Sequence, residues 1–84
     1  MDNRRKKILF RSWHRGTKEM DLIMGNFADK YIKDLSDEQL DAYEILLEVP
    51  DLDVYDWVSG KADAPANAPY STLLEQIIDN KVYE

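Results

Sequence analysis

The stretch Thr17–Tyr31 (TKEMDLIMGNFADKY) carries the strongest helical pattern in the chain. Its large apolar residues recur at intervals of three and four, the period of one helix face: Met20, Ile23, Met24, Phe27 and Tyr31. Thr17 precedes this run and is placed to cap the helix. Gly25 lies inside it and predicts either a close neighbour or a bend at that point. The stretch therefore predicts an amphipathic helix that buries one side.

A second helix is predicted just before it, within residues 4–15. Three apolar residues fall at helical spacing, with Ile8 beside them: Leu9, Phe10 and Trp13. Gly16 follows a last turn rich in basic side chains, which is typical of a helix that ends in a left-handed glycine cap. The two helices are therefore expected to meet at a tight corner.

A third helix is marked by its own capping residues. Ser36 and Gln39 have the spacing of a capping box, so the helix is expected to begin at Asp37. Pro50 disfavours helical geometry at the residue before it and is expected to end the helix.

Two short helices are predicted in the rest of the chain. Asp51 or Asp53 can cap one that stops near Gly60. After an alanine- and proline-rich loop, Thr72 and Glu75 match a second capping box. The apolar face of this last helix consists of Leu74, Ile77, Ile78 and Val82.

Length and composition set the fold class. The chain has 84 residues, 44% hydrophobic and 33% charged, which is ordinary globular composition for one small core. No stretch alternates apolar and polar residues with period two. We therefore predict an all-α fold, a compact bundle of about five short helices, with residues 1–84 forming a single domain.

Charge is distributed unevenly along the chain. Residues 1–19 hold seven Lys and Arg against two acids, whereas residues 20–84 hold four against fifteen. The acidic remainder would repel a polyanion, so the pattern favours a protein partner over nucleic acid. No apolar run approaches the length of a membrane span, and the charged start lacks a signal-type apolar core. A cytoplasmic, bacterial-type protein without a transit peptide or membrane insertion is expected.

Residues suited to catalysis or metal binding are scarce. The chain has no cysteine and one histidine, His14, so neither a zinc site nor a histidine-based triad is expected. The three glycines are isolated, so no glycine-rich loop is present to hold a nucleotide phosphate. We expect no catalytic residue, no metal and no cofactor bound by the chain itself. The chain is therefore expected not to be an enzyme.

The corner sequence Arg15–Glu19 (RGTKE) has two interpretations. Helix capping alone explains each residue, because the arginine suits a helix end, Gly16 a left-handed cap and Thr17 an N-cap. Alternatively, the corner projects Arg15 and Glu19 beside a bare glycine backbone, which suits docking against another protein. Physical chemistry alone does not choose between them.

The corner also carries a family resemblance. Arg15, Gly16 and Glu19 reproduce the R-G-x-x-E motif of the succinate dehydrogenase assembly factor 2 family, the FAD assembly factors. The surrounding stretch Phe10–Phe27 (FRSWHRGTKEMDLIMGNF) resembles the signature region of that family. The stretch Leu46–Gly60 (LLEVPDLDVYDWVSG) is similar to its second signature. The family fold is a five-helix bundle, in agreement with the helices predicted above.

The resemblance implies an assembly chaperone that is a monomer when free. Such proteins bind the flavoprotein subunit of succinate dehydrogenase, and also of fumarate reductase, and promote covalent attachment of FAD to that subunit. The implied partner-binding residues lie at or beside the corner: Arg11, His14, Arg15, Gly16 and Glu19. The alternative is an antitoxin-like or cytoskeleton-associated regulator that acts through protein binding.

Overall fold

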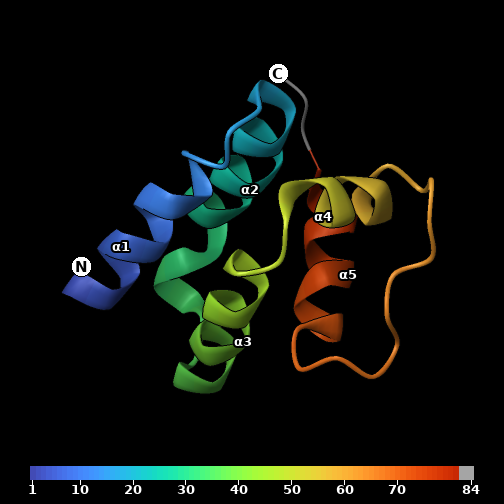
Figure 1. The fold of residues 1–84 in the computed structure, drawn as a ribbon. Helices are drawn as coiled ribbons and strands as arrows, with labels where there is room; N and C mark the ends of the chain where they lie inside the picture. The colour runs from blue at the N-terminus through green and yellow to red at the C-terminus, as the bar shows by residue number, and fades with distance from the viewer. Residues whose placement is uncertain (82–84) are drawn as a thin grey trace.

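The computed structural model describes residues 1–81, and within them it contains five α-helices, one 3₁₀ turn and no strand (Figure 1). The elements, in chain order, are α1 (Asn3–Ser12), α2 (Lys18–Tyr31), the 3₁₀ turn η1 (Ile32–Asp34), α3 (Asp37–Leu47), α4 (Asp51–Val58) and α5 (Ser71–Asn80). This confirms the predicted all-α fold. Residue Val82, expected on the last apolar face, lies outside the described residues.

Helix α2 is the centre of the bundle. It packs against α1 on one side and α5 on another, while α3 contacts both α1 and α5 (Figure 1). Its predicted stripe is buried except for the half-buried Tyr31. The other helices complete one hydrophobic core around it, because burying such a stripe is what stabilises short helices in water.

The N-terminal caps of α2 and α3 are those predicted. The Thr17 hydroxyl accepts a hydrogen bond from the Met20 amide at 3.2 Å. In α3 the Gln39 amide donates to the Ser36 hydroxyl at 3.2 Å, and the Ser36 amide donates to the Gln39 side chain at 2.8 Å. Both helices therefore begin where local side-chain chemistry satisfies their free amides.

The predicted caps of the last two helices are wrong. The residue at the N-cap of α4 is Pro50, and neither Asp51 nor Asp53 caps the helix with its side chain. Helix α5 begins at Ser71, with no side-chain cap, instead of after Thr72. Side-chain contacts other than the predicted caps are made at both helix starts.

Ser71 illustrates this for α5. Its hydroxyl donates to the Pro65 carbonyl at 2.6 Å and accepts from the Ala68 amide at 3.0 Å. The serine ties the preceding loop to the helix start, and the helix begins two residues earlier than the capping pattern predicted.

The spacing of the apolar residues did not settle which side of helix α1 faces the core, and the structure does. Phe10 is 62% exposed, whereas Ile8 and Ser12 are buried. The Ser12 hydroxyl donates to the Ile8 carbonyl at 2.8 Å and lies 2.6 Å from the hydroxyl of buried Tyr43 on α3. Burial raises the pKa of Tyr43, so its hydroxyl stays neutral in this contact. The hydroxyl pair fixes which side of α1 turns inward.

Gly25 marks a close approach and not a bend. An added β carbon at this position would lie 2.2 Å from the indole ring of Trp13, which follows α1. The Trp13 Nε1 donates to Asp29 Oδ1 at 3.2 Å, farther along α2. The indole therefore lies flat on the backbone of α2, and only glycine leaves room for it.

Candidate functional site

The corner between α1 and α2 is a turn set by glycine geometry. Gly16 has a φ of +117°, which side-chain-bearing residues rarely adopt, and this confirms the predicted left-handed conformation. The predicted cap role is wrong, because α1 ends at Ser12 with Trp13 as its C-cap, so Gly16 shapes the turn and does not cap the helix. The Arg15 amide donates to Asp21 Oδ1 at 2.6 Å, so the first turn of α2 also holds the corner. The corner is therefore bonded to the helix that follows it.

Arg15 points into the protein, and the expectation that it projects from the corner is wrong. Its side chain is only 8% exposed. One terminal guanidinium nitrogen, Nη1, donates to the Leu47 carbonyl at 2.6 Å, and the second, Nη2, donates to the Val49 carbonyl at 2.8 Å. These carbonyls lie at the C-terminal end of α3, where helices leave acceptors unsatisfied, and that end attracts a cation.

The third contact of Arg15 is an ion pair with the start of α4. Its Nε lies 2.6 Å from Asp51 Oδ1, and the Asp51 side chain is 27% exposed. Neither atom makes a well-aligned hydrogen bond with another described residue, so charge holds the pair together. An added β carbon at Gly16 would lie 3.2 Å from Asp51 Oδ2. The absent side chain thus leaves room for the carboxylate.

In the sequence, Asp51 has the position of a capping residue, and this pairing with Arg15 was not predicted. Each of the two stretches that resemble the family signatures contributes one member of the pair. Phe10–Phe27 contains Arg15, and Leu46–Gly60 contains Asp51. Their opposite charges were the only signal available, and it is a weak one, because many acids in this chain could pair with Arg15.

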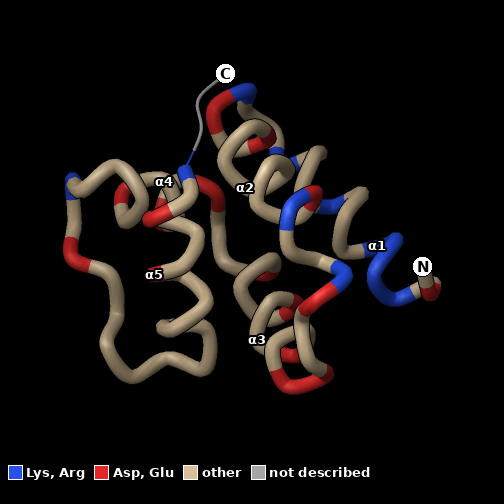
Figure 2. Tube along the Cα trace, turned by 180° about the vertical axis from the view of Figure 1, so that it is seen from behind, with Lys and Arg blue, Asp and Glu red and all other residues tan. Residues whose placement is uncertain are grey.

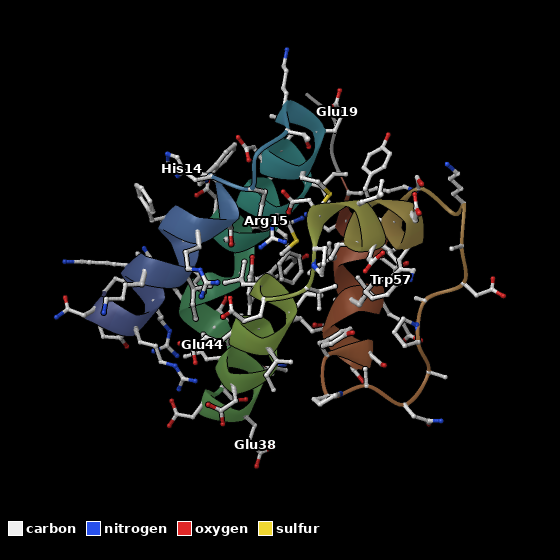
Figure 3. All side chains as sticks on the ribbon, in the orientation of Figure 1. His14, Arg15, Glu19, Glu38, Glu44 and Trp57 are labelled. Carbon is white, nitrogen blue, oxygen red and sulfur yellow. The ribbon has the colours of Figure 1, made fainter. Side chains whose placement is uncertain are left out.

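The other predicted site residues lie on the outside. Glu19 is exposed at the outer end of α2, while Arg15 lies near the middle of the molecule (Figure 3). Arg11 is exposed and pairs at 2.5 Å with Glu48, the residue that follows α3. His14 is exposed and stacks on Phe10, with ring centroids 3.9 Å apart. Three of these features therefore follow one another at the end of α1 and in the corner: the stacked rings of Phe10 and His14, the paired side chain of Arg11, and the turn at Gly16.

A shallow hollow of about 570 Å³ lies beside the glycine turn. Its lining combines aromatic, cationic and backbone groups: Trp13, His14, Gly16, Thr17, Lys18, Asp21 and Leu22. Such an open, mixed surface suits contact with a protein, because one side chain of a partner can enter while the rim stays hydrated.

The basic start of the chain is largely neutralised within the molecule. Lys and Arg follow α1 and the corner, and Asp and Glu mark α3 beside them (Figure 2). Each of the four arginines has an intramolecular carboxylate partner: Arg4 pairs with Asp41 and Glu44, Arg5 with Asp2, Arg11 with Glu48, and Arg15 with Asp51. The arginines are thus used mainly to hold α1 and the corner against the rest of the fold.

Residues 1–81 lack two further features. This part of the chain holds no group of three or more histidine, cysteine or acidic side chains arranged to bind a metal ion. It also has no helix with the length and hydropathy required to cross a bilayer.

Comparison with known families shows to which family the chain belongs. A family model described as the flavinator of succinate dehydrogenase matches residues 6–81, which is most of the chain. This chain belongs to the succinate dehydrogenase flavinator family. The resemblance drawn from the corner motif is confirmed. The flavinator family is named for assembly and not for catalysis, in agreement with the expectation that the chain is not an enzyme.

Curated relatives in the flavinator family are named succinate dehydrogenase assembly factor 2, mitochondrial. The Dictyostelium discoideum protein is 44% identical over 61 residues, covering 73% of this chain and 43% of the relative. The Debaryomyces hansenii protein is 33% identical over 90 aligned residues, covering all of this chain and 63% of the relative. The Saccharomyces cerevisiae protein is also 33% identical and is covered over 56% of its length. The chain therefore spans about half the length of the curated relatives it matches.

The names of these flavinator relatives overturn one expectation. All three are described as mitochondrial. The expectation of a cytoplasmic, bacterial-type protein is therefore wrong by this comparison, which points to the mitochondrion.

Proposed function

We propose that this chain is an assembly chaperone that binds the flavoprotein subunit of succinate dehydrogenase and promotes covalent attachment of FAD to it. The family description supports the flavin step, and the names of the relatives support assembly of succinate dehydrogenase. Fumarate reductase, whose flavoprotein subunit presents a similar task, is a second client in this proposal. In this proposal the chain is a monomer when free, and it acts by docking on its client, the flavoprotein subunit.

The observation that carries the proposal is the contrast between the two charged residues of the corner. Arg15 is buried and fixes the turn, whereas Glu19 is exposed beside a glycine that presents bare backbone. A rigid turn with one projecting carboxylate can dock without losing much conformational entropy. In this proposal Glu19, Gly16, His14 and Arg11 face the client, and Arg15 supports them from below.

The proposed mechanism assigns the chemistry to the client and its flavin. The reactive group is the FAD that the client holds, and this chain stabilises a client arrangement in which attachment proceeds. A docked factor can shift the client only by binding one arrangement more tightly than another. The carboxylate of Glu19 and the bare turn at Gly16 are the groups proposed to make that distinction.

Glu19→Ala is expected to abolish most of the promotion of flavin attachment while leaving the fold intact. Glu19 is exposed in the first turn of α2, so its removal costs folding only about 0.3–1 kcal/mol of helix-dipole energy. Glu38→Ala is the matched control, because Glu38 is an exposed acid in the first turn of α3, away from the corner (Figure 3). The measurement is in-gel flavin fluorescence of the client subunit after incubation with FAD and each variant.

Equal activity of the Glu19→Ala and Glu38→Ala variants would contradict the assignment of the corner. A deletion strain whose flavoprotein subunit still carries its normal covalent flavin would contradict the function itself. The first outcome tests which residues bind the client, and the second tests whether the chain promotes flavin attachment at all.

The isolated protein is expected to bind free FAD no tighter than high micromolar, about −5 to −6 kcal/mol. A phosphate cradle needs several adjacent glycines, and here Gly25 is covered by Trp13 while Gly16 faces the Asp51 carboxylate, which repels phosphate. Titration calorimetry of the purified protein with FAD tests this. A low-micromolar site would show that the chain carries the flavin itself.

A further inference from the structure

We infer that Asp51 is a positioning residue, which holds the corner in its binding-competent shape through Arg15 without touching the client. This inference rests on the proposed docking function of the corner. It assigns to the first residue of α4 a role in recognition that neither helix capping nor the corner motif indicates.

Within the corner, Arg15 and Gly16 depend most on side-chain contacts, because Trp13 and His14 donate backbone hydrogen bonds to α1 and Thr17 caps α2. Helix α1 ends at Ser12 and α2 begins at Lys18, so the residues between them lie outside both helices. The shape at Arg15 and Gly16 depends chiefly on the bond from the Arg15 amide to Asp21 and on the three contacts of the Arg15 guanidinium. Arg15 is thus the point at which the corner is attached to both α3 and α4.

Asp51 carries the only negative charge among the described groups that contact the Arg15 guanidinium. The Leu47 and Val49 carbonyls are dipoles, and without a carboxylate they leave a nearly buried guanidinium uncompensated. Because such a cation moves toward water, loss of the Asp51 charge is expected to release Arg15 and let the turn at Gly16 sample other shapes. The fold that surrounds the corner consists of helices with their own core contacts.

A loosened corner has a specific kinetic signature. If only a fraction of molecules holds the competent shape, the apparent affinity falls by that fraction. The association rate constant falls with it, whereas the dissociation rate constant is unchanged, because the bound complex has the same contacts. Removal of a residue that touches the client acts mainly on dissociation.

The test measures association and dissociation of the client flavoprotein subunit by stopped flow, with Asp51→Asn beside the matched control Asp53→Asn. Asp53 is an exposed acid in the same first turn, so both variants remove the same charge from the same helix end. Asp51→Asn is expected to slow association about tenfold with dissociation unchanged within about twofold. Asp53→Asn is expected to match the wild type in both rates.

Asp21→Asn provides a second variant if Asp51→Asn does not fold. It weakens the hold on the Arg15 amide without leaving a buried charge, so the same kinetic signature is expected at smaller amplitude. Wild-type association by a folded Asp51→Asn variant overturns the inference, and so does faster dissociation at unchanged association. Wild-type protein that fails to bind the flavoprotein subunit overturns the proposed function instead.

Discussion

Arg15→Ala is expected to lower the melting temperature by about 15 °C or more. Removal of one partner of a buried ion pair costs about 3–5 kcal/mol, and in a domain of this size each kcal/mol is worth about 4–8 °C. The loss leaves Asp51 without its counter-ion and removes the donors to the Leu47 and Val49 carbonyls. Each unsatisfied group adds its own desolvation cost.

Arg11→Ala is the matched control for this prediction. Its ion pair with Glu48 is exposed on both sides, 43% for the arginine and 75% for the glutamate. Exposed pairs of this kind contribute about 0–1 kcal/mol, so the melting temperature should fall by only a few degrees. Circular dichroism melts of both variants give the comparison, and equal shifts would show that burial of Arg15 contributes nothing.

The difference between the two arginines changes how the corner motif is interpreted. From the sequence, Arg15 and Glu19 look like equivalent docking residues. In the structure, Arg15→Ala is expected to impair activity through the fold, and Glu19→Ala through the surface. An activity assay of Arg15 variants therefore has to be run below their lowered melting temperature before any loss is ascribed to client binding.

The parts of the fold that could be predicted are those determined by neighbours in sequence. Thr17 caps α2 and Ser36 caps α3 because each side chain reaches an amide only three residues ahead. The positive φ at Gly16 follows from the same local logic. Helix identity, the central stripe of α2 and the glycine turn were therefore accessible from the sequence.

The parts that could not be predicted depend on contacts between distant residues. Ile8, Leu9 and Phe10 are consecutive apolar residues, so spacing alone left the inward side of α1 ambiguous, and the buried Ser12–Tyr43 contact decides it. Likewise Asp51 has the chemistry of an N-cap, yet the buried guanidinium of Arg15 takes its carboxylate. The local sequence predicted a capping role for Asp51, whereas in the structure Asp51 forms an ion pair with Arg15, which is distant in the sequence.

Gly25→Ala is expected to destabilise the protein by about 1–3 kcal/mol, although alanine is the better helix former by about 1 kcal/mol. The added methyl group would lie 2.2 Å from the Trp13 ring, a rigid body that cannot yield by rotating a flexible end. The indole would have to leave α2 and lose its hydrogen bond to Asp29. The clash therefore outweighs the helix propensity.

The sign of this effect should reverse once the ring is gone. In a Trp13→Ala background nothing opposes the methyl group, so Gly25→Ala is expected to stabilise the protein by about 1 kcal/mol. Urea denaturation of the four proteins in this cycle is expected to give a coupling energy of about 2–4 kcal/mol, at or just above the upper end of the range for residues in direct contact. A Gly25→Ala substitution that stabilises both backgrounds equally would mean that Trp13 does not rest on α2. The helix interior would then tolerate a side chain where the structure leaves space for none.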